Sequence, residues 1–571
     1  MGLRESNIER MQQDVYDVLV IGGGINGSVS AAALAGKGVK TALVDAGDWA
    51  GMTSEHTSNL AWGGIKYMES YDFKLVRELC KSRNHLMRNY PSTVQEIRFL
   101  TTLMKGFRHH PLYLWAGGWL YWFMGNCFTR IPRLPSIKTV NQEEPIIDTS
   151  NAIGCFEYSD AYLHDNDSRF VFNFVRLAMN SGCAAANYVE SVSAKRTNGR
   201  WQVGLKDSLT GEKFQMEAKA IVNACGPLAD DYNQKIGVKT DHSHVLSKGI
   251  HIIVNQLTSN KRVLAFFDDE GRLFFVIPMG NRTCIGTTDT RTEDPRPEVN
   301  DADIEFLLKN INERLALDQP LEKSDIISTR CGVRPLAVQA DSGQSRDFLQ
   351  LSRKHHIDFD AEQGHLSIFG GKLTDCLNVG NEITEKVESL GIQVPYRDYR
   401  WYGEPDDSVR EEFFHQARLM DLDSYTPKTS SEPLSTRLWR RYAANAIGML
   451  EQIREDPKQA EILIEGTEYV RCEIHETARR EMITKLEDFL RRRSKISMVS
   501  NTETIRQSSG LMEACEILFG DQAKAKYDEY FAERNVSTSD DQDQHQAEEA
   551  KPLNGADAIA VEGVVSEPLN W

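Results

Sequence analysis

The sequence lacks the marks of disulfide-linked, zinc-binding and nucleic-acid-binding proteins. Its ten cysteines form no C-x-x-C pair and follow no regular spacing. Neither a disulfide framework nor a zinc site is therefore indicated, and we expect reduced, buried thiols and no metal site. The formal net charge is −17, which argues against nucleic acid as a partner because contacts with phosphates need a basic surface.

Targeting signals are also missing. The 16 residues before Asp17 include the acids Glu5, Glu9 and Asp14, so no secretory or transit peptide fits there. With 571 residues, 40% of them hydrophobic and 26% charged, the chain is expected to hold two or three globular domains of a soluble protein.

The feature that organises the sequence is a buried strand followed directly by a glycine-rich turn. Asp17–Ile21 is almost wholly apolar, as expected of a parallel strand buried on both faces. Gly22, Gly24 and Gly27 then follow with the spacing that allows a tight turn, close approach to a pyrophosphate and close helix–strand packing. A second strand ends at Asp45, whose carboxylate can accept ribose hydroxyls. These features predict an α/β, Rossmann-like domain that binds a dinucleotide.

The stretch 53–67 is small, polar and rich in glycine, which is typical of a loop laid against a cofactor. Its hydroxyls, its amide and the pair Gly63–Gly64 suit close contact with a pyrophosphate or a ring. A plain surface loop is the alternative that composition alone leaves open.

Pro111–Thr129 holds no charge over 19 residues and is rich in aromatic side chains. At about 1.5 Å per helical residue it could nearly span a bilayer, but glycines interrupt it and its aromatic residues do not gather at the two ends. Because Lys105, Arg108, Arg130 and Arg133 flank it, an interfacial segment with arginines on lipid headgroups is favoured. A buried cap helix and a membrane span are the alternatives.

Residues 71–104 have a helical period, whereas strands dominate from His251 to Thr288. The alternation in Leu273–Ile277 favours a mixed or antiparallel sheet, which would form a substrate domain inserted into the nucleotide domain. Two more strands lead into glycine-bearing motifs at 332–335 and 370–374. The second of these motifs opens a helix, whose free N–H groups can face an electron-rich group.

Charged amphipathic helices follow from about residue 408, at 409–420, 437–452, 473–492 and 504–531. They predict a separate helical domain. Beyond Asn535 the chain is rich in Ser, Asp, Gln, Glu and Ala and poor in aromatic residues, so a disordered acidic tail is expected.

Five motifs stand in one order along the chain. They are Gly22-x-Gly24-x-x-Gly27, Gly63-Gly64-Ile-Lys66-Tyr67, Asn223-Ala-x-Gly226-Pro227, Gly332-Val-Arg334-Pro335 and Gly370-Gly371-Lys372-Leu373-Thr374. Together they resemble the FAD-dependent respiratory glycerol-3-phosphate dehydrogenases, within the D-amino-acid-oxidase-like flavoenzymes. The likeness covers about residues 14–530 and includes the helical segment 477–493.

The resemblance implies a Rossmann-like FAD-binding domain with an interleaved mixed-sheet substrate domain, followed by a helical domain and the tail. The expected parts are 14–100, 151–240 and 346–395 for FAD binding, 101–150 for a cap or membrane-proximal segment, 241–345 for the substrate domain, 408–535 for the helical domain and 536–571 for the tail.

The expected cofactor is FAD. The residues expected to bind it are Gly22, Gly24, Ile25, Asn26, Gly27, Asp45, Thr53, Ser54, Ser58, Gly63, Gly64, Val189, Gly226, Gly371, Lys372, Leu373 and Thr374.

The chain departs from the family's Lys-Leu-Ile-His-Gly-Gly-x-Arg-Tyr motif. Asn59, Trp62 and Lys66 replace the lysine, the histidine and the arginine. A lysine keeps the charge of arginine but not its two-pronged grip on phosphate. Asp375 stands where a second threonine is usual. These departures leave flavin chemistry intact and bear on the choice of substrate.

The reaction implied is oxidation of sn-glycerol 3-phosphate to dihydroxyacetone phosphate, with a hydride passed to the flavin. Arg334 is expected beside the substrate and Lys372 near both substrate and flavin. His251 is the candidate base because the unperturbed pKa of imidazole is near 6.5; Arg334 or a water molecule competes for that role, and a structural core histidine is the alternative. Lys66 and Tyr67 are expected to hold the phosphate.

The electron acceptor is expected to be a membrane quinone. No nicotinamide fingerprint recurs later in the chain, and no cysteine motif indicates an iron–sulfur cluster. The aromatic, arginine-flanked segment instead indicates docking at a membrane surface, with oxygen as the alternative acceptor. The expected location is cytoplasmic, peripherally bound to the inner face of the membrane. The oligomeric state stays open, and a homodimer is one option.

Other classes of protein remain as alternatives. A soluble FAD oxidase of the same superfamily would use oxygen on another small hydroxy or amino acid and release peroxide. A nicotinamide dehydrogenase would be colourless. A non-catalytic flavin-bearing interaction protein would bind FAD, yet no substrate would bleach it.

Overall fold

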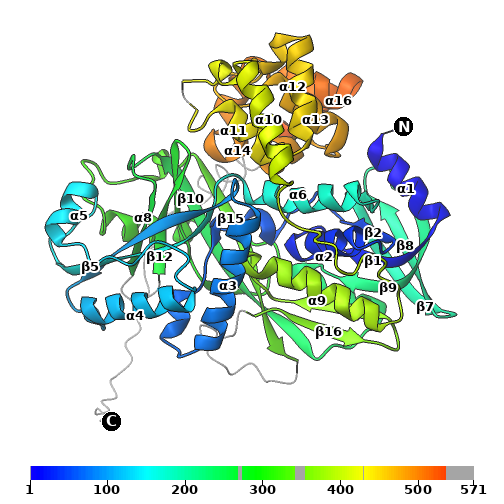
Figure 1. Ribbon diagram of the computed structural model, residues 1–571, viewed down its shortest axis with the longest axis horizontal. Helices are drawn as coiled ribbons and strands as arrows, with labels where there is room; N and C mark the ends of the chain where they lie inside the picture. The colour runs from blue at the N-terminus through cyan, green and yellow to red at the C-terminus, as the bar shows by residue number, and fades with distance from the viewer. Residues whose placement is uncertain (1, 268–272, 341–353, 429, 535–571) are drawn as a thin grey trace, which may run out of the picture.

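Two β-sheets and a C-terminal group of helices make up the protein (Figure 1). The computed structural model describes residues 2–267, 273–340, 354–428 and 430–534. The α/β class with a helical C-terminal region is confirmed, whereas the expected acidic tail lies outside the described residues. All ten cysteines are among the described residues and are free thiols.

The first sheet is built around β1 (Val15–Ile21), which pairs in parallel with β2 (Thr41–Val44) on one side and β9 (Lys213–Asn223) on the other. The apolar sequence of β1 is explained by this central place, because both of its faces are covered. The sheet is completed by β6 (Ala184–Ala186), β7 (Val189–Thr197), β8 (Arg200–Asp207), β16 (His356–Asp360) and β17 (His365–Phe369). The chain leaves β1 toward β2 and later returns on the other side at β9, which makes the end of β1 a topological switch point where ligands of open α/β sheets bind.

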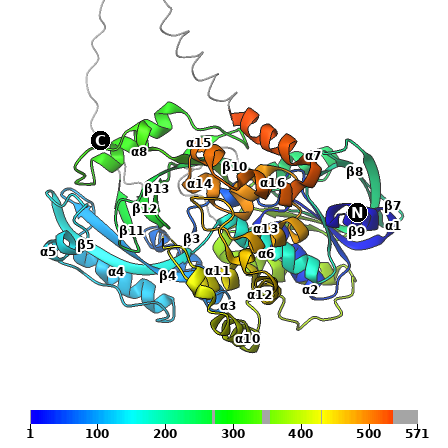
Figure 2. The ribbon, with the colours of Figure 1, turned by 90° about the horizontal axis from the view of Figure 1, so that it is seen from above.

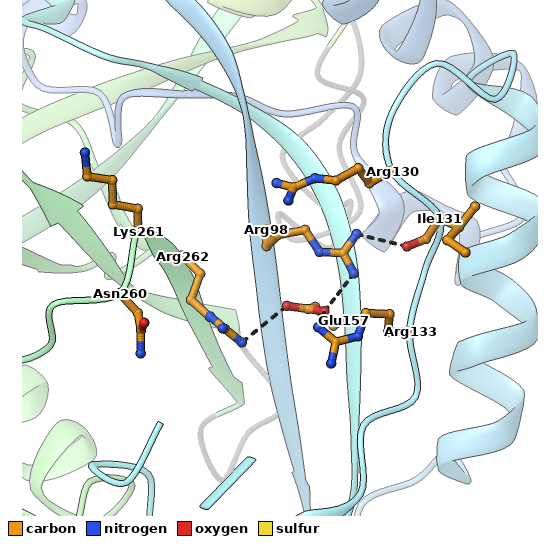
Figure 3. A pocket seen from close by; sticks show the side chains of 8 residues that line it. All are labelled: Arg98, Arg130, Ile131, Arg133, Glu157, Asn260, Lys261 and Arg262. Carbon is orange, nitrogen blue, oxygen red and sulfur yellow. Dashed lines mark hydrogen bonds and ion pairs between the residues drawn. The ribbon is translucent and has the colours of Figure 1, made fainter. Parts of the chain in front are cut away.

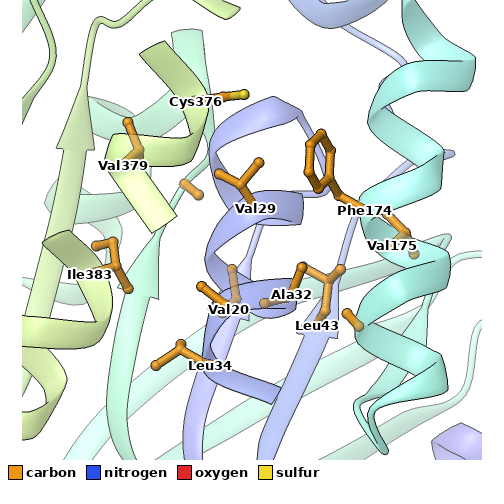
Figure 4. Packing of buried hydrophobic residues seen from close by; sticks show 14 of the residues in the cluster. Val20, Val29, Ala32, Leu34, Leu43, Phe174, Val175, Cys376, Val379 and Ile383 are labelled. Carbon is orange, nitrogen blue, oxygen red and sulfur yellow. The ribbon is translucent and has the colours of Figure 1, made fainter. Parts of the chain in front are cut away.

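Helix α2 (Ile25–Gly36) starts at this switch point and is buried between α6 (Asp167–Asn180) and α9 (Cys376–Ser389), as Figure 4 shows. Its run of alanines, 31–33, is fully buried. Small side chains let the two neighbouring helices come close, and Val29 packs between Phe174 and Val379 of those helices. The tight packing fixes the start of α2 against the sheet.

The second sheet carries the long antiparallel pair of β10 (His242–Asn255) and β15 (Ser328–Gln339). In this pair His251 lies opposite Arg330 and Ser247 opposite Arg334. The other strands are β3 (Leu60–Ala61), β4 (Val94–Met104), β5 (Ala152–Leu163), β11 (Arg262–Phe267), β12 (Leu273–Met279), β13 (Arg282–Gly286) and β14 (Thr290–Thr292). The mixed sheet expected from the alternation in 251–288 is thus present.

The predicted helix over 71–104 is only half right. Helix α3 (Phe73–Asn89) ends before Pro91, and β4 follows as a buried strand of the second sheet. An apolar run such as Ile97–Leu103 fits a buried helix as well as a buried strand, and pairing with β5 and β11 decides for the strand. The expected boundaries of the domains stay a prediction, but β4 and β5 belong to the second sheet rather than to the first.

The glycine-arginine motif at 332–335 lies inside β15 rather than in a turn after a strand. The C-terminal helices are also shorter than predicted, because breaks such as the positive φ of Ala443 (50°) divide them. They are α10 (Asp407–Leu419), α11 (Leu434–Tyr442), α12 (Asn445–Glu455), α13 (Arg471–Arg480), the π-helical turn η9 (Asp488–Arg493), α14 (Ile496–Val499), α15 (Thr502–Gln507), α16 (Leu511–Phe519) and a last helical stretch over 523–534. Figure 2 shows this group from above, lying over α6.

The uncharged aromatic run forms α4 (Pro111–Met124), which packs on β5 and α3 at the margin of the second sheet (Figure 1). Tyr121 and Met124 of this helix are buried, whereas Leu120 and Phe123 are exposed by 44% and 69%. None of the helices among the described residues has both the length and the apolar character needed to cross a bilayer. The helix therefore has one buried face and one apolar face turned outward.

The glycine turn makes a strong prediction for stability. A Cβ atom on Gly27 would lie 1.8 Å from the carbonyl oxygen of Gly22, so the Gly27→Ala variant must push the turn away from α2. We expect it to lose roughly 1–3 kcal/mol of the free energy of unfolding, measured by urea denaturation.

Gly448→Ala is the matched control, because Gly448 lies within a helix and its added Cβ would meet no atom within 4 Å. That change should stabilise the protein by roughly 0.5–1 kcal/mol. Equal effects of the two substitutions would contradict the assignment of Gly27 to a close backbone contact.

Candidate functional site

The glycine turn between β1 and α2 is closed by backbone contacts that leave no room for side chains. Gly22 has a φ of 104°, and a Cβ atom there would lie 2.4 Å from the carbonyl oxygen of Ala224 at the end of β9. Gly24 precedes the first residue of α2, and the Ile25 N–H at the start of that helix donates to the Ser54 hydroxyl over 3.0 Å. Such a cradle, with a helix N-terminus behind it, suits a pyrophosphate.

Asp45 follows β2 at the same edge of the sheet. Its two carboxylate oxygens accept from the backbone N–H groups of Gly23, over 2.5 Å, and Gly47, over 2.8 Å. Burial raises the pKa of Asp45 against the effect of these N–H donors. Val189, at the start of β7, donates its N–H to the Asp45 carbonyl over 2.7 Å. The carboxylate is thus held at the end of the strand, where a ribose would lie in a dinucleotide fold.

The loop 53–64 lies between the start of α2, where Ser54 accepts from the Ile25 N–H, and the second sheet. The Thr53 hydroxyl donates to the carbonyl of Val333 on β15 over 2.7 Å, and the Gly63 N–H donates to Asp160 of β5 over 3.0 Å. A Cβ on Gly63 would lie 2.2 Å from the Tyr121 hydroxyl, while Gly64 has a φ of 78°. The alternative of a plain surface loop is thereby excluded.

The later glycine motifs converge on the same edge. The side-chain amide of Asn26 donates to the carbonyl of Gly370 over 3.2 Å, and a Cβ atom on Gly371 would lie 3.7 Å from that amide. Gly226 follows β9 with a φ of 56°, and an added Cβ would meet open space. Segments from three distant parts of the sequence therefore meet at the end of β1.

His251 lies on β10 with 1% of its surface exposed. Its Nε2 atom is 2.8 Å from the Ser58 hydroxyl, while its buried Nδ1 atom has no hydrogen-bond partner in the described part of the chain. Burial, and then the charges of Arg330 and Arg334, hold the pKa of His251 well below its usual value. The ring is therefore neutral at pH 7, with a proton on one nitrogen and a lone pair on the other.

Arg334 reaches across β10 toward the turn after β13. Its guanidinium donates to the Thr287 hydroxyl over 2.8 Å and to the Thr288 carbonyl over 3.3 Å, and it lies 3.5 Å from the carboxylate of Asp289. The side chain keeps 27% of its surface exposed. Gly249 allows this path, because a Cβ atom there would lie 2.5 Å from the guanidinium.

Lys372 lies against an aromatic wall that the sequence alone did not reveal. Its ammonium nitrogen is 4.2 Å from the ring centre of Tyr67 and 5.6 Å from that of Trp62, which in turn contacts Phe275 of β12 at 6.5 Å. Phe275 lies opposite Gly286 in the sheet, and Gly286 lies opposite His251. The lysine, the wall and the histidine thus form one continuous surface.

Not every expected residue joins this surface. Lys66 is exposed in the turn η2 (Ile65–Met68), whereas its neighbour Tyr67 is half-buried. Leu373 and Thr374 start the turn η6 (Leu373–Asp375), and the Thr374 hydroxyl donates to the carbonyl of Trp62 over 3.4 Å. This turn ties the Lys372 loop to the aromatic wall.

Asp375, one of the departures from the family motif, belongs to a cluster around the buried His355 that the sequence analysis did not predict. Its carboxylate is 2.9 Å from Nδ1 of His355, whose Nε2 is 2.9 Å from Glu382 on α9. The Ser82 hydroxyl donates to the other oxygen of Asp375 over 2.7 Å. Burial would lower the pKa of His355, but Asp375 and Glu382 raise it to about 9. The protonated His355 therefore holds Asp375, at the end of the Lys372 loop, in place.

The C-terminal helices reach the cofactor edge through Asp48, three residues after Asp45. Arg492 donates to Asp48 over 2.7 Å, and Arg493 donates to both of its oxygens over 2.8 Å. Burial would raise the pKa of Asp48, but the charges of Arg493 and Arg492 outweigh it and hold that pKa below its usual value. The partners lie more than 400 residues apart in sequence, so no local pattern pointed to them.

A dinucleotide fits this arrangement. The structure offers a glycine cradle, a helix N-terminus and a buried carboxylate, with the cations of Arg334 and Lys372 and the buried His251 further along. Comparison with known proteins decides the family, because residues 17–370 match the family described as FAD dependent oxidoreductase. The chain belongs to that family. It is an oxidoreductase, and its cofactor is FAD.

Individual relatives agree with this family. Glycerol-3-phosphate dehydrogenase 2 of Mycobacterium tuberculosis strain H37Rv is 30% identical over 86% of this chain and 82% of its own length. D-erythritol 1-phosphate dehydrogenase of Brucella abortus is 32% identical over 64% of this chain and 72% of its own. The crystal structure of the Bacillus halodurans glycerol-3-phosphate dehydrogenase complexed with FAD has a TM-score of 0.69 at 22% identity, over 93% of this chain and 97% of that one. The resemblance stated from the five motifs is confirmed.

The cluster around His355 makes stability depend on pH. The pKa of His355 is raised from about 6.5 in the unfolded chain to about 9 in the fold. The protonated His355 therefore contributes on the order of 3 kcal/mol to the free energy of unfolding. This contribution is complete below pH 6.5 and is lost as the pH rises to about 9. We expect the free energy of unfolding of the wild type, measured by urea denaturation, to fall between pH 6.5 and 9. In the His355→Gln variant this fall should be absent.

His365→Gln provides the control, because burial lowers the pKa of His365 to about 4. A histidine that is neutral in both states above pH 6.5 adds no slope there. A wild-type stability that stays level between pH 6.5 and 9 would contradict the ion pairs assigned to His355.

Proposed function

We propose that this protein oxidises sn-glycerol 3-phosphate to dihydroxyacetone phosphate with its bound FAD and passes the electrons to a membrane quinone. The observation that carries the proposal is the surface formed by Lys372, Tyr67, Trp62, Phe275 and His251 beside Arg334. Relatives named glycerol-3-phosphate dehydrogenase support the choice of substrate.

Two cations suit a substrate that carries a phosphate. The guanidinium of Arg334 is held by Thr287, Thr288 and Asp289, so its positive charge has a fixed position and attracts a phosphate group without further ordering of the side chain. Lys372 is held by the aromatic wall and adds a point charge. Lys66 is exposed and would close on the phosphate from the solvent side, next to Tyr67.

FAD, when bound, supplies the acceptor for the hydride that leaves the substrate carbon. The task left to the protein is to take the hydroxyl proton and to stabilise the developing negative charge. We assign the hydroxyl proton to Nδ1 of His251, in the tautomer whose Nε2–H donates to the Ser58 hydroxyl, because the ring is neutral and Nδ1 has no hydrogen-bond partner in the described part of the chain. Arg334 lies on the neighbouring strand and stabilises the charge.

Anaerobic mixing with glycerol 3-phosphate tests the reaction. Bleaching of the flavin absorbance by the phosphate ester, and not by glycerol, is the expected result. Arg334→Ala should keep the yellow colour and lower kcat/KM by about a hundredfold or more, as expected for loss of a bidentate charged contact.

D-erythritol 1-phosphate serves as a second substrate in the same experiment, because one relative bears that name. Faster bleaching by the four-carbon ester would change the substrate but keep the reaction. Peroxide formation with a hydroxy or amino acid, and no bleaching by either phosphate ester, would overturn the proposal in favour of an oxidase.

Docking at the inner face of the membrane is the second part of the proposal. The outer face of α4 carries Leu112, Tyr113, Leu120 and Phe123, with exposed fractions of 55%, 59%, 44% and 69%. Apolar residues on one face of a helix, flanked by basic residues, are typical of interfacial segments. Tyr121 of the buried face donates to Asp160, which also accepts from Gly63 of the cofactor loop, so this helix joins the flavin site to the membrane side.

A charge placed on this face should release the protein from lipid. Phe123→Glu is expected to abolish flotation with phospholipid vesicles and quinone reduction in them, while turnover with a soluble dye as acceptor is kept. Leu419→Glu is the control, because Leu419 on α10 is also 69% exposed. Equal flotation of the Phe123→Glu variant and wild type would remove α4 from the membrane contact.

A further inference from the structure

A basic pocket of about 400 Å³ lies on the second sheet and takes no part in the site described above (Figure 3). It is lined by Arg98, Arg130, Ile131, Arg133, Glu157, Asn260, Lys261 and Arg262. Five of these eight residues are cations and one is an acid. The whole protein is acidic, with a formal net charge of −17, so a pocket lined by five cations is unusual for this chain.

The strand register places the pocket on the face away from the flavin. Arg98 of β4 lies directly opposite Arg262 of β11, and alternate residues of a strand point to opposite faces. Phe99 belongs to the core that includes Trp62 and Tyr121 on the flavin side, whereas Leu100 belongs to the core on the other side. Arg98 and Arg262 therefore face away from His251 and α4.

Arg98 and Arg262 lie opposite one another, and such like-charged pairs on neighbouring strands are destabilising. The buried carboxylate of Glu157 reduces the repulsion between them. Glu157 is 2.7 Å from Arg98, 3.2 Å from Arg133 and 3.4 Å from Arg262. Figure 3 shows its carboxylate between the three guanidinium groups. The three arginines of the pocket floor thus share this one buried carboxylate.

Other acids approach the pocket from its surroundings. Glu143 pairs with Arg133 and Arg262, Glu144 with Arg262, and Glu96 with Arg130 through its Nε atom.

Two donors at the mouth remain after these pairs are counted. Lys261 forms no ion pair in the described part of the chain, and the terminal nitrogens of Arg130 make no described hydrogen bond, since only its backbone N–H and Nε donate to Glu96. The side chain of Arg130 is 64% exposed. The floor of the pocket, formed by Glu157 and Arg98, is thus buried and paired. The cations at its rim, Lys261 and the terminal nitrogens of Arg130, have no partner among the described residues.

We propose that this pocket binds the phosphate group of a second ligand, separate from the substrate. Arginine forks match the tetrahedral oxygens of a phosphate, and the volume admits a phosphate with a small substituent. Ile131, exposed by 52%, lines the same rim and belongs to the loop that follows α4. The phosphate can come from an anionic lipid headgroup or from a soluble phosphate, and the two sources are separable by experiment.

The test uses the FAD-loaded protein and the double variant Arg130→Ala/Lys261→Ala, which removes the two rim donors and leaves the buried floor intact. Its control is Arg418→Ala/Lys213→Ala, a pair of exposed cations on α10 and β9. The probes are inorganic phosphate in calorimetry and flotation with vesicles of phosphatidylcholine, alone or mixed equally with phosphatidylglycerol. We expect the pocket variant to weaken binding of one probe by about tenfold or more.

A loss confined to the phosphatidylglycerol vesicles identifies a lipid headgroup, and a loss confined to inorganic phosphate identifies a soluble ligand. Either result supports the pocket. Binding of both probes at wild-type strength by the pocket variant overturns it and leaves these cations as ion-pair partners only. Turnover of glycerol 3-phosphate with a soluble dye is measured alongside and should be unchanged, so failure of this proposal is distinct from failure of the proposed reaction.

Discussion

The buried ion pairs between Asp48 and the arginines Arg492 and Arg493 are the constraint on which the rest of the structure depends. Asp48 lies between the carboxylate that holds the glycine turn, Asp45, and the loop that begins at Thr53. Its side chain is inaccessible to water and accepts three arginine hydrogen bonds within 2.8 Å. Removing one partner of such a pair leaves an uncompensated buried charge and typically costs 3–5 kcal/mol. The C-terminal helices are therefore part of the cofactor edge.

Two further carboxylates, Asp160 and Asp375, join segments that are distant in the sequence. Asp160 joins α3, α4 and the cofactor loop by accepting from Arg83, Tyr121 and Gly63. Asp375 follows the Lys372 loop and contacts two other segments. It accepts from Ser82 of α3, and it pairs with His355, which directly precedes β16. Each carboxylate fixes a glycine-bearing segment that cannot hold its own position, because glycine adds conformational freedom and no side-chain contacts. The glycine-bearing segments of the cofactor edge are thus held by charged side chains that other elements supply.

The sequence predicted well the local architecture around the glycine turn. The strand, the glycine turn, α2 and Asp45 lie within one βαβ unit, so spacing alone placed them correctly. The partners of Asp48 and Asp375 come from distant segments, and no periodicity could reveal them. Residues 94–104 were assigned to a helix because an apolar run fits both kinds of element, and only the neighbouring strands decide. Trp62 was recognised as a departure from the family motif, but its role in an aromatic wall depends on Phe275 from another strand.

The claim that buried charge pairs hold the flavin edge is tested most directly by the affinity for FAD after Asp48→Asn. This change keeps the size of the side chain and removes the charge from a residue that lies behind Asp45 rather than in the glycine cradle. The dissociation constant, from the recovery of flavin fluorescence on release, should rise by about tenfold or more, with the free energy of unfolding measured in parallel. Retention of FAD at wild-type affinity would contradict the account, because the C-terminal helices would then have no part in holding the cofactor.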